Sequence, residues 1–546
     1  MPRGGAAAAR AAAVTAAAGL LGLVVVLPVL RLAGVVGREG SGVVVATVGS
    51  AGLRTALAHT LALAAAVTLT AVPIGTTLAL VLRRPDLPGR AFWRGAVLLP
   101  LVVPDFVLGY SWSRAYGVAG FTDSVLGVHW AGLLGAGGVG VVLAVHSAPL
   151  AYLVVAVGLA ARAEPDLERA ARASGAGPAT TLVTVTLPLV RPALAAASVL
   201  VFVLTLGSFA IPQILGTPGG FGTVTTRIYA DLSLGGDPAS FLRAVTAALL
   251  LVVVAAAVVT PSDLLLAPRL RATRPATAQG LPHVPRSRAV SWAQAAGLAL
   301  YLALTLLLPL AALALASITR ALGVPPTPAN WSLVHFREVL TPRTAEALAR
   351  SVVLAGIAAT VLLVLGGLVA GSVRHRAGRA TATLVTLPLV LPGSTLAVAL
   401  LITYGRWLGG TSALILLAYV AKLWAFAHRP IAGALDRLPP DELRASRVSG
   451  AGPLTAVRTV VLRPLAPALL AAWMVCFLTA LHEVTMSSLL YGPGSETLAV
   501  VVLNSEELGR IGPTAALSVT LTLLVAVPAL VLWAAVGRLR IRGGRG

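Results

Sequence analysis

Long apolar runs alternate along the chain with short stretches rich in arginine, glycine and proline. Each apolar run is about 20 residues long, the length that a helix needs to cross roughly 30 Å of hydrocarbon at 1.5 Å per residue. A membrane β-barrel would instead show segments of about ten residues with alternating polarity. Because backbone polar groups must be paired within a bilayer, the pattern predicts an all-α integral membrane protein.

Hydropathy windows predict about twelve transmembrane helices in two sets of six. The first set covers approximately residues 11–32, 55–82, 93–112, 133–160, 191–212 and 243–266. The second set covers approximately residues 294–316, 350–373, 381–404, 411–433, 464–488 and 512–537. We therefore predict a first half at residues 1–266, a cytoplasmic linker rich in arginine and proline at residues 267–293, and a second half at residues 294–546.

The N-terminal run follows Arg3 and Arg10, a pattern that also occurs in secretory signal peptides. We prefer a retained first helix, because the run is longer than a usual signal core and its removal would leave an odd number of spans. Lysine and arginine lie mainly in loops that one consistent topology places in the cytoplasm. This topology predicts that both termini are cytoplasmic.

Composition supports the membrane assignment, since 57% of the 546 residues are hydrophobic and only 11% are charged. The net charge of +22 could indicate nucleic-acid binding only if the basic residues formed one surface stripe. They form short clusters between apolar runs, so we expect a lipid bilayer as partner and no nucleic acid. The single cysteine, Cys476, excludes an intramolecular disulfide, and no Cys/His cluster has zinc-site spacing, so no metal site is expected.

Two segments of the first half return in the second. The sequence RAARASGAGP at residues 169–178 reappears as RASRVSGAGP at residues 444–453, and LPLVVP at 99–104 reappears as LPLVLP at 387–392. Each copy holds an even number of predicted spans, so both copies enter the membrane in the same direction. The repeat therefore predicts two tandem parallel six-helix units.

A polar segment at residues 164–175, between the fourth and fifth predicted spans, has the marks of a short helix. Pro165 suits the first helical position, Glu164 and Glu168 place negative charge at the positive end of the helix dipole, and Gly175 can adopt a left-handed conformation. In the second half, Pro440, Asp441 and Glu442 open the equivalent helix and Gly450 closes it. Small residues on these helices would allow a partner protein to approach closely.

The pattern Glu-Arg-Ala-Ala-x-x-x-Gly at 168–175, followed by LPLVRPAL at 187–194, resembles the cytoplasmic EAA loop of permeases from binding-protein-dependent ABC importers. The resemblance implies a MetI-like fold, docking of both short helices on a homodimeric ABC ATPase, and an extracytoplasmic substrate-binding protein. The residues implied to contact the ATPase are Glu168, Arg169, Ala170, Ala171, Gly175 and Pro188 in the first half, and Glu442, Arg444, Ala445, Ser446, Gly450 and Pro464 in the second.

This chain departs from the family pattern at two points. Arg169 and Arg444 stand where the family usually has glutamate, and Pro464 lies one position later than the repeat predicts from Pro188. These departures leave the ion pairs with the ATPase open. A solvated loop with ordinary helix caps is the alternative interpretation of both segments.

The chain has no Gly-x-x-x-x-Gly-Lys-Ser/Thr motif, and its only lysine is Lys422. It therefore lacks the loop with which ATPases hold phosphates. We expect a transport permease that is not an enzyme and binds no cofactor itself, with ATP and magnesium on the partner ATPase. The expected location is the inner or plasma membrane of a prokaryote.

The stretches LTLGSFAIP at 204–212 and LTALHEVTMSSLLY at 478–491 resemble the fused permeases of ferric-iron importers. The resemblance favours ferric iron as the solute, while thiamine and aminoethylphosphonate permeases share the layout and remain alternatives. Possible pathway residues are Ser208, Phe209, His482, Glu483 and Asp105. His482 and Glu483 are the best candidates, since an ionisable group in a span is costly and often functional, and Ser208 is the residue that the repeat places opposite Glu483.

A position at the outer membrane edge is an equally open interpretation for His482 and Glu483. His146 and Lys422 are weaker candidates, because snorkelling or an interhelical hydrogen bond explains such residues more often. The main rival function is a secondary transporter, which would need buried carboxylates or broken helices near mid-membrane. A membrane-embedded enzyme is a third alternative, but the predicted spans contain no group of His, Asp and Glu residues with catalytic or metal-binding spacing.

Overall fold

The computed structural model describes residues 12, 15–38, 41–162, 165–271, 287–321, 323–372, 385, 387–438, 440–450 and 452–543. Within these ranges the regular elements are helices, and β-pairing is limited to two isolated bridges. Ten helices are long and apolar enough to cross a membrane: Thr15–Arg38, Ala51–Leu82, Ala136–Ala161, Pro178–Leu206, Pro238–Ser262, Arg288–Ile318, Pro342–Gly371, Ser412–Leu435, Val457–Leu481 and Ile511–Val531. The all-helical membrane fold expected from the sequence is thus confirmed.

The third predicted span of each half is interrupted. In the first half, α5 (Arg90–Ala96) and a short 3-10 turn (Leu99–Leu101) are followed after a break by α6 (Asp105–Tyr116), and the chain bends there by 96°. If this bent pair counts as one span, the described part of the chain has eleven. Pro100 and Pro104 explain the break, because proline lacks the N–H that an uninterrupted helix requires.

The repeated motif interrupts the second half in the same way. Helix α19 (Leu387–Val390) ends before Pro392, and α20 (Gly393–Leu408) begins after it. The predicted span at 381–404 is therefore two short helices in its described part, while residues 373–384 and 386 lie outside the described residues. The two interrupted third spans, one in each half, account for the difference between twelve predicted spans and the ten continuous spans in the described residues.

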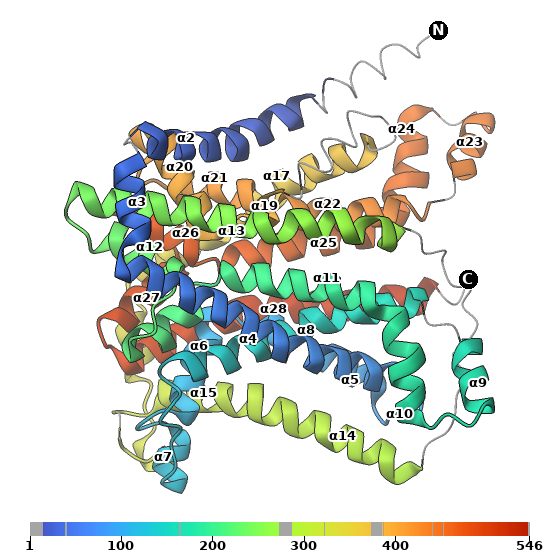
Figure 1. The fold of residues 1–546 in the computed structure, drawn as a ribbon, viewed down its shortest axis with the longest axis horizontal. Coiled ribbons are helices and arrows are strands. Elements are labelled where there is room, and N and C mark those ends of the chain that lie inside the picture. The colour runs from blue at the N-terminus through green and yellow to red at the C-terminus, as the bar shows by residue number, and fades with distance from the viewer. Residues whose placement is uncertain are drawn as a thin grey trace. The chain divides into compact units, whose positions relative to one another are not determined.

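The chain divides into two compact units, which do not coincide with the two sequence halves. Unit 1 contains Met1–Val48, Ile228–Leu249 and Phe336–Gly546, and unit 2 contains Gly49–Arg227 and Leu250–His335. Each unit thus includes the first helical span of the other half. Figure 1 labels the helices of both units.

Unit 2 is built around α4 (Ala51–Leu82), α8 (Ala136–Arg162) and α11 (Leu187–Leu206), which pack against one another. Gly75 permits the close contact of α4 with α8, since a Cβ atom there would lie 2.6 Å from the backbone nitrogen of Tyr152. Helix α15 (Leu308–Ile318), from the second half, packs against α6. Just before it, the Thr305 carbonyl accepts a hydrogen bond from Trp112 Nε1 at 3.1 Å.

Unit 1 is built around α17 (Pro342–Ser372), α22 (Trp424–Leu435) and α25 (Arg463–Leu481). Helix α28 (Ile511–Gly543) packs against α25 and α27 (Leu498–Glu507). From the first half, α2 (Leu27–Arg38) packs against α20, and the Tyr404 hydroxyl donates to the Leu23 carbonyl at 2.8 Å. The N-terminal span is therefore an integral part of this unit.

The predicted linker at 267–293 is partly helical. Helix α13 (Pro238–Arg271) extends into it from one side, and α14 (Arg288–Leu302) begins within it on the other. Residues 272–286 lie outside the described residues, as do the arginines Arg3 and Arg10 that precede the first span.

Candidate functional site

The short polar helix predicted between the fourth and fifth spans is present as α9 (Pro165–Ala173). It starts at Pro165, and it closes with two hydrogen bonds, from Ala176 N to the Ala171 carbonyl at 3.0 Å and from Gly175 N to the Arg172 carbonyl at 2.9 Å. Gly175 has φ +86° and open space around its Cβ position. Glycine is thus required here by the backbone conformation and not by crowding.

The second half builds the equivalent helix α23 (Pro440–Val448) with the same local contacts. Gly450 has φ +82°. Ser449 donates from its backbone N and its hydroxyl to the Ala445 carbonyl, at 2.9 and 3.0 Å, as Ser174 does to the Ala170 carbonyl at 3.0 Å for both bonds. The prediction of two matching short helices is therefore confirmed.

Most of the residues predicted to dock on a partner lie at the surface of these two helices. Arg169, Ala170 and Gly175 are exposed in the first half, and Ala171 is half-buried. In the second half Glu442, Ala445 and Gly450 are exposed, Ser446 is half-buried, and the side chain of Arg444 is outside the described part. Arg169 forms an exposed ion pair with Asp166 at 3.0 Å. Each helix therefore offers a narrow surface of small side chains.

Glu168 differs from this group because its side chain is buried. Arg83 Nη2 lies 3.2 Å from Glu168 Oε1, and Thr186 donates its hydroxyl to the same oxygen at 2.9 Å. The structure thus buries Glu168 and separates it from the exposed residues that were predicted to dock on a partner. It instead ties α9 to the end of α4 and to the turn before α11.

Arg83 and Thr186 were not among the residues singled out from the sequence. Arg83 follows an apolar run, as basic residues at the cytoplasmic ends of spans commonly do, so nothing in the sequence distinguished it. The repeat gives no signal either, because the residue 275 positions after Glu168 is Leu443. The repeat therefore could not predict the contact between Glu168 and Arg83.

Pro188 and Pro464 occupy the same structural position despite their different spacing in the repeat. Each is the second residue of its helix, α11 or α25. The π-helical turn before α11 contains five residues, Leu182–Thr186, whereas the turn before α25 contains six, Val457–Leu462. The longer turn absorbs the extra residue before the span begins. Pro188 is half-buried and Pro464 is exposed.

The two breaks in the third spans are each bridged by an ionisable side chain. His146 is the eleventh residue of α8, and Lys422 is the eleventh residue of α21 (Ser412–Lys422). His146 Nδ1 lies 3.1 Å from the Pro100 carbonyl oxygen. Lys422 Nζ donates to the Pro388 carbonyl at 2.9 Å and also to that of Leu391. Both side chains therefore satisfy carbonyl groups that the broken helices leave unpaired.

The predicted pathway residues of unit 2 are engaged in local contacts. Asp105, the first residue of α6, lies 3.0 Å from His146 Nε2 through its Oδ1. The carbonyl of Ser208 accepts the Thr225 hydroxyl at 2.6 Å, and Phe209 is 2% exposed. Phe209 is therefore a packing residue in this structure.

In unit 1, Glu483 caps the short helix α26 (Thr485–Leu490). Its carboxylate accepts from Met486 N at 2.9 Å and from Ser487 N at 3.1 Å. The Ser487 hydroxyl in turn bonds that of Tyr419 at 2.8 Å. His482 is half-buried at the end of α25. Within the described residues no group of three His, Cys, Asp or Glu side chains could hold a metal ion.

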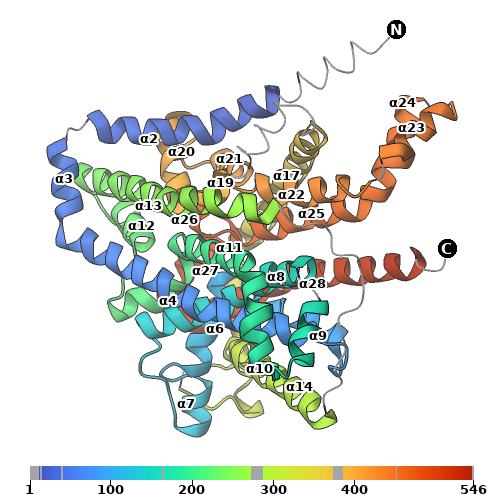
Figure 2. The same cartoon turned by 45° about the vertical axis from the view of Figure 1, so that its right-hand side comes forward.

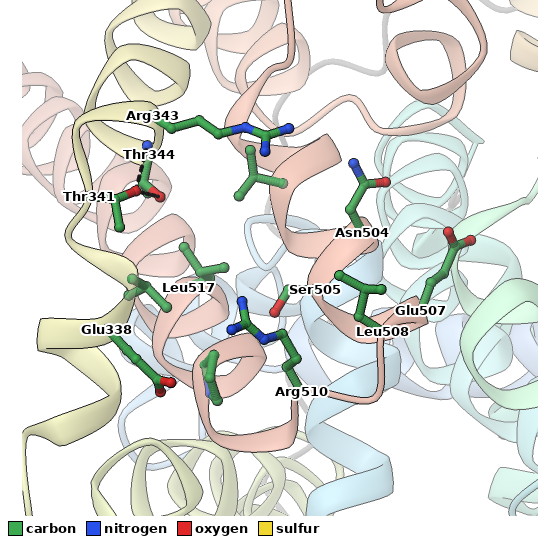
Figure 3. Close-up of a pocket in the computed structure, with 13 residues that line it drawn as sticks. Glu338, Thr341, Arg343, Thr344, Asn504, Ser505, Glu507, Leu508, Arg510 and Leu517 are labelled. Carbon is green, nitrogen blue, oxygen red and sulfur yellow. Dashed lines mark hydrogen bonds between the residues drawn. The ribbon is translucent and has the colours of Figure 1, made fainter. Parts of the chain in front are cut away.

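A polar pocket of about 580 Å³ opens in unit 1 at the start of α17 and between α27 and α28 (Figure 3). Helices α27 and α23 lie at opposite ends of this unit (Figures 1 and 2). Beside the pocket, Arg343 Nη2 lies 2.6 Å from Glu496 Oε1. The polar residues that line it are Glu338, Thr341, Arg343, Thr344, Asn504, Ser505, Glu507 and Arg510.

Comparison with known proteins places these features in context. A family described as binding-protein-dependent transport system inner membrane component matches residues 71–272 and again residues 362–540. A ferric-iron transport permease, FbpB 2 of Haemophilus influenzae, is 25% identical over 497 residues, covering 87% of this chain and 89% of the relative.

Further relatives include a second ferric permease and a molybdenum permease. The ferric transport permease FbpB of Actinobacillus pleuropneumoniae is 23% identical and covers 80% of this chain and 64% of its own length. The molybdenum transport permease ModB of Escherichia coli is 35% identical over 164 residues, which cover 29% of this chain and 70% of the relative. The two matched stretches of the family contain α9 and α23, respectively.

Proposed function

Because the chain belongs to the binding-protein-dependent transport system inner membrane components, which are permeases of ABC transporters, we propose that it imports ferric iron with energy from a separate ATPase. In this proposal the ATPase is a homodimer that docks on α9 and α23 and carries ATP and magnesium. An extracytoplasmic binding protein delivers the solute, and both chain termini lie in the cytoplasm of a prokaryote.

The observation that carries the proposal is the buried Glu168. A docked partner would touch the exposed residues of α9, while Glu168 on the same helix is held by Arg83 of the α4 end and by Thr186 before α11. Movement of α9 would therefore shift the ends of two membrane helices together. Helix α23 precedes the π-helical turn Val457–Leu462 and α25, so its movement would reach that span along the chain.

Support for ferric iron comes from the names and coverage of the relatives. Two ferric transport permeases align with 80% or more of this chain, whereas the molybdenum permease aligns with 29% of it. The described spans carry no cluster of hard oxygen ligands of the kind that ferric iron prefers. Selectivity would then rest with the binding protein, and thiamine or aminoethylphosphonate remain alternatives on the layout alone.

A transporter driven by an ion gradient is the second candidate, and the broken third spans favour it. Such transporters use interrupted helices with ionisable groups beside them, and here His146 and Asp105 flank one break and Lys422 spans the other. Membership of the ABC permease family and the paired short helices favour the ATP-driven alternative.

Transport by the purified assembly distinguishes these functions. The full chain, copurified with its ATPase, is placed in liposomes with ATP inside and ferric-loaded binding protein outside, and radiolabelled iron is counted. We expect uptake that requires both ATP and binding protein, and little uptake of molybdate. Uptake driven by a proton gradient without ATP would establish the second candidate and overturn the first.

A further inference from the structure

Three arginines line a small pocket in unit 2, where α4 ends and α5 begins. Arg83 follows the last residue of α4, and Arg90 and Arg94 lie one turn apart on α5. The cavity has a volume of about 170 Å³. Its remaining lining residues are Ala79, Leu82, Tyr152, Ala156, Leu159 and Ala160. The pocket is therefore a strongly basic recess with otherwise mostly apolar walls.

The positive charge of this recess exceeds what the described residues neutralise. Arg83 shares the carboxylate of Glu168, but its Nη1 is buried and has no hydrogen-bond partner among the described residues. Arg90 Nε and Arg94 Nε donate to the same acceptor, the Leu82 carbonyl, at 3.1 and 3.3 Å. Neither forms an ion pair with a carboxylate in the described part of the chain. The Arg90 and Arg94 charges also repel each other.

An anion with several acceptor oxygens would give Arg83 Nη1 a hydrogen-bond partner and would also reduce the repulsion between Arg90 and Arg94. Arginine guanidinium groups bind phosphate through parallel N–H donors, and a buried donor without an acceptor is costly. Arg83 Nη1 and the outer nitrogens of Arg90 and Arg94 could share one phosphate group. A single chloride ion would offer only one acceptor atom to three separate guanidinium groups.

The surroundings favour a phosphate that belongs to a lipid. Phe92, between the two α5 arginines, is 64% exposed, and Trp93 next to it donates Nε1 to the Pro88 carbonyl at 2.9 Å. Exposed aromatic residues beside arginine at the end of a span are typical of the membrane interface. We propose that this recess binds the phosphate of an anionic phospholipid such as phosphatidylglycerol, with acyl chains along the apolar walls.

Lipid binding here would act on the link to α9. The same guanidinium group that holds Glu168 through Nη2 would hold the lipid phosphate through Nη1. A bound lipid would thereby fix the orientation of Arg83 and strengthen its contact with Glu168. The binding itself requires only the recess, so it can be tested without any assumption about transport.

The experiment measures lipid retention and thermal stability of the purified full chain. The protein in neutral detergent is supplied with phosphatidylglycerol, with phosphatidylcholine or with inorganic phosphate, and bound lipid is counted by native mass spectrometry. The test variant is Arg90→Gln with Arg94→Gln. The control is Arg191→Gln, which removes an exposed arginine from the start of α11 in the same unit.

We expect wild type and the control to retain phosphatidylglycerol in preference to phosphatidylcholine and to unfold at higher temperature with it. The double variant should bind it roughly tenfold more weakly, on the basis of about a few-fold for each arginine near the membrane surface. A separate variant, Arg94→Lys, keeps the positive charge and should bind phosphatidylglycerol nearly as well as the wild type. Binding by this variant would show that the weaker binding of the double variant comes from the lost charge and not from misfolding.

Two results would overturn the proposal. Equal stabilisation by inorganic phosphate and by phosphatidylglycerol would show that the recess takes free phosphate and not lipid. Equal retention of phosphatidylglycerol by the double variant and by Arg191→Gln would show that the lipid binds elsewhere on the chain.

Discussion

Arg83 and Glu168 lie 85 positions apart in the chain, yet their side chains meet at 3.2 Å where the end of α4 contacts α9. Arg83 is partly exposed, with 22% of its side chain accessible, whereas Glu168 has only 7%. The contact is therefore a partly buried ion pair in which Glu168 is largely shielded from solvent. It joins α9, the helix on which we propose that the ATPase docks, to the ends of α4 and α11.

Substitution Glu168→Gln tests this connection. Loss of the carboxylate leaves Arg83 without a counter-charge, so we expect the free energy of unfolding to fall by about 1–2 kcal/mol. Iron transported per ATP hydrolysed should fall more than ATP hydrolysis itself. The control is Asp166→Asn, which removes only an exposed pair with Arg169 and should cost less than about 0.5 kcal/mol. Unchanged coupling in Glu168→Gln would contradict the transmission role.

Substitution of Gly175 or Gly450 by leucine should uncouple ATP hydrolysis from transport while the protein still inserts. Both glycines have positive φ, and a larger residue there costs roughly 1–2 kcal/mol of backbone strain. That strain lowers the population of correctly closed helix about 5- to 30-fold. Gly177→Leu is the matched control, since Gly177 has φ −68° and equally open space. Normal transport per ATP in both leucine variants would count against the docking assignment.

Lys422→Met should destabilise the protein by about 2 kcal/mol, because the Pro388 carbonyl loses its donor inside the membrane. Lys422→His should recover part of that loss, since histidine performs the same task at residue 146 of the first half. Thermal unfolding in detergent measures both changes. Equal stability of Lys422→Met and wild type would show that the carbonyl groups at the break are satisfied in another way.

Acid should weaken the contact of Glu496 with Arg343. Burial raises the pKa of Glu496, but the hydrogen bond and charge of Arg343, a hydrogen bond from the Glu496 backbone and the charge of Arg350 together outweigh burial and hold the pKa below the ordinary value of 4.5. A lowered folded-state pKa means that the contribution is fully present above pH 4.5 and is lost as the pH falls through the folded-state value. We expect the stability difference between wild type and Glu496→Gln to shrink below pH 4.5. A difference that is constant with pH would refute the ion pair.

The membrane spans and the short helices α9 and α23 were largely predictable because their sequence signals are local. Pro165 and Pro440 mark helix starts, Gly175 and Gly450 mark the ends, and the structure has both helices where these residues predicted them. The effect of a proline or glycine at a helix end depends only on the backbone conformation of a few neighbouring residues. The apolar runs likewise report the length of each span without reference to its neighbours.

Contacts between distant segments were not predictable in the same way. Glu168 was expected at the docking surface, but whether a helical side chain faces a partner or the chain's own spans depends on Arg83, which lies far away in sequence. The equivalence of His146 and Lys422 was also missed, because the two residues differ in type and their contacts with the breaks are visible only in three dimensions. The hydropathy windows did not show the breaks because they average over about 19 residues, although the prolines of the repeated motif are a local signal for an interrupted helix.

The assignment of α2 to unit 1 has a consequence for how the protein is made. The span at residues 15–38 enters the membrane first, but its packing partner α20 begins only at Gly393. Unit 2, by contrast, has all its candidate membrane spans once α15 ends at Ile318. During synthesis this helix therefore exists before the surface that will bury it, and only the short connection through α3 (Ser41–Gly49) to α4 holds it near the growing protein.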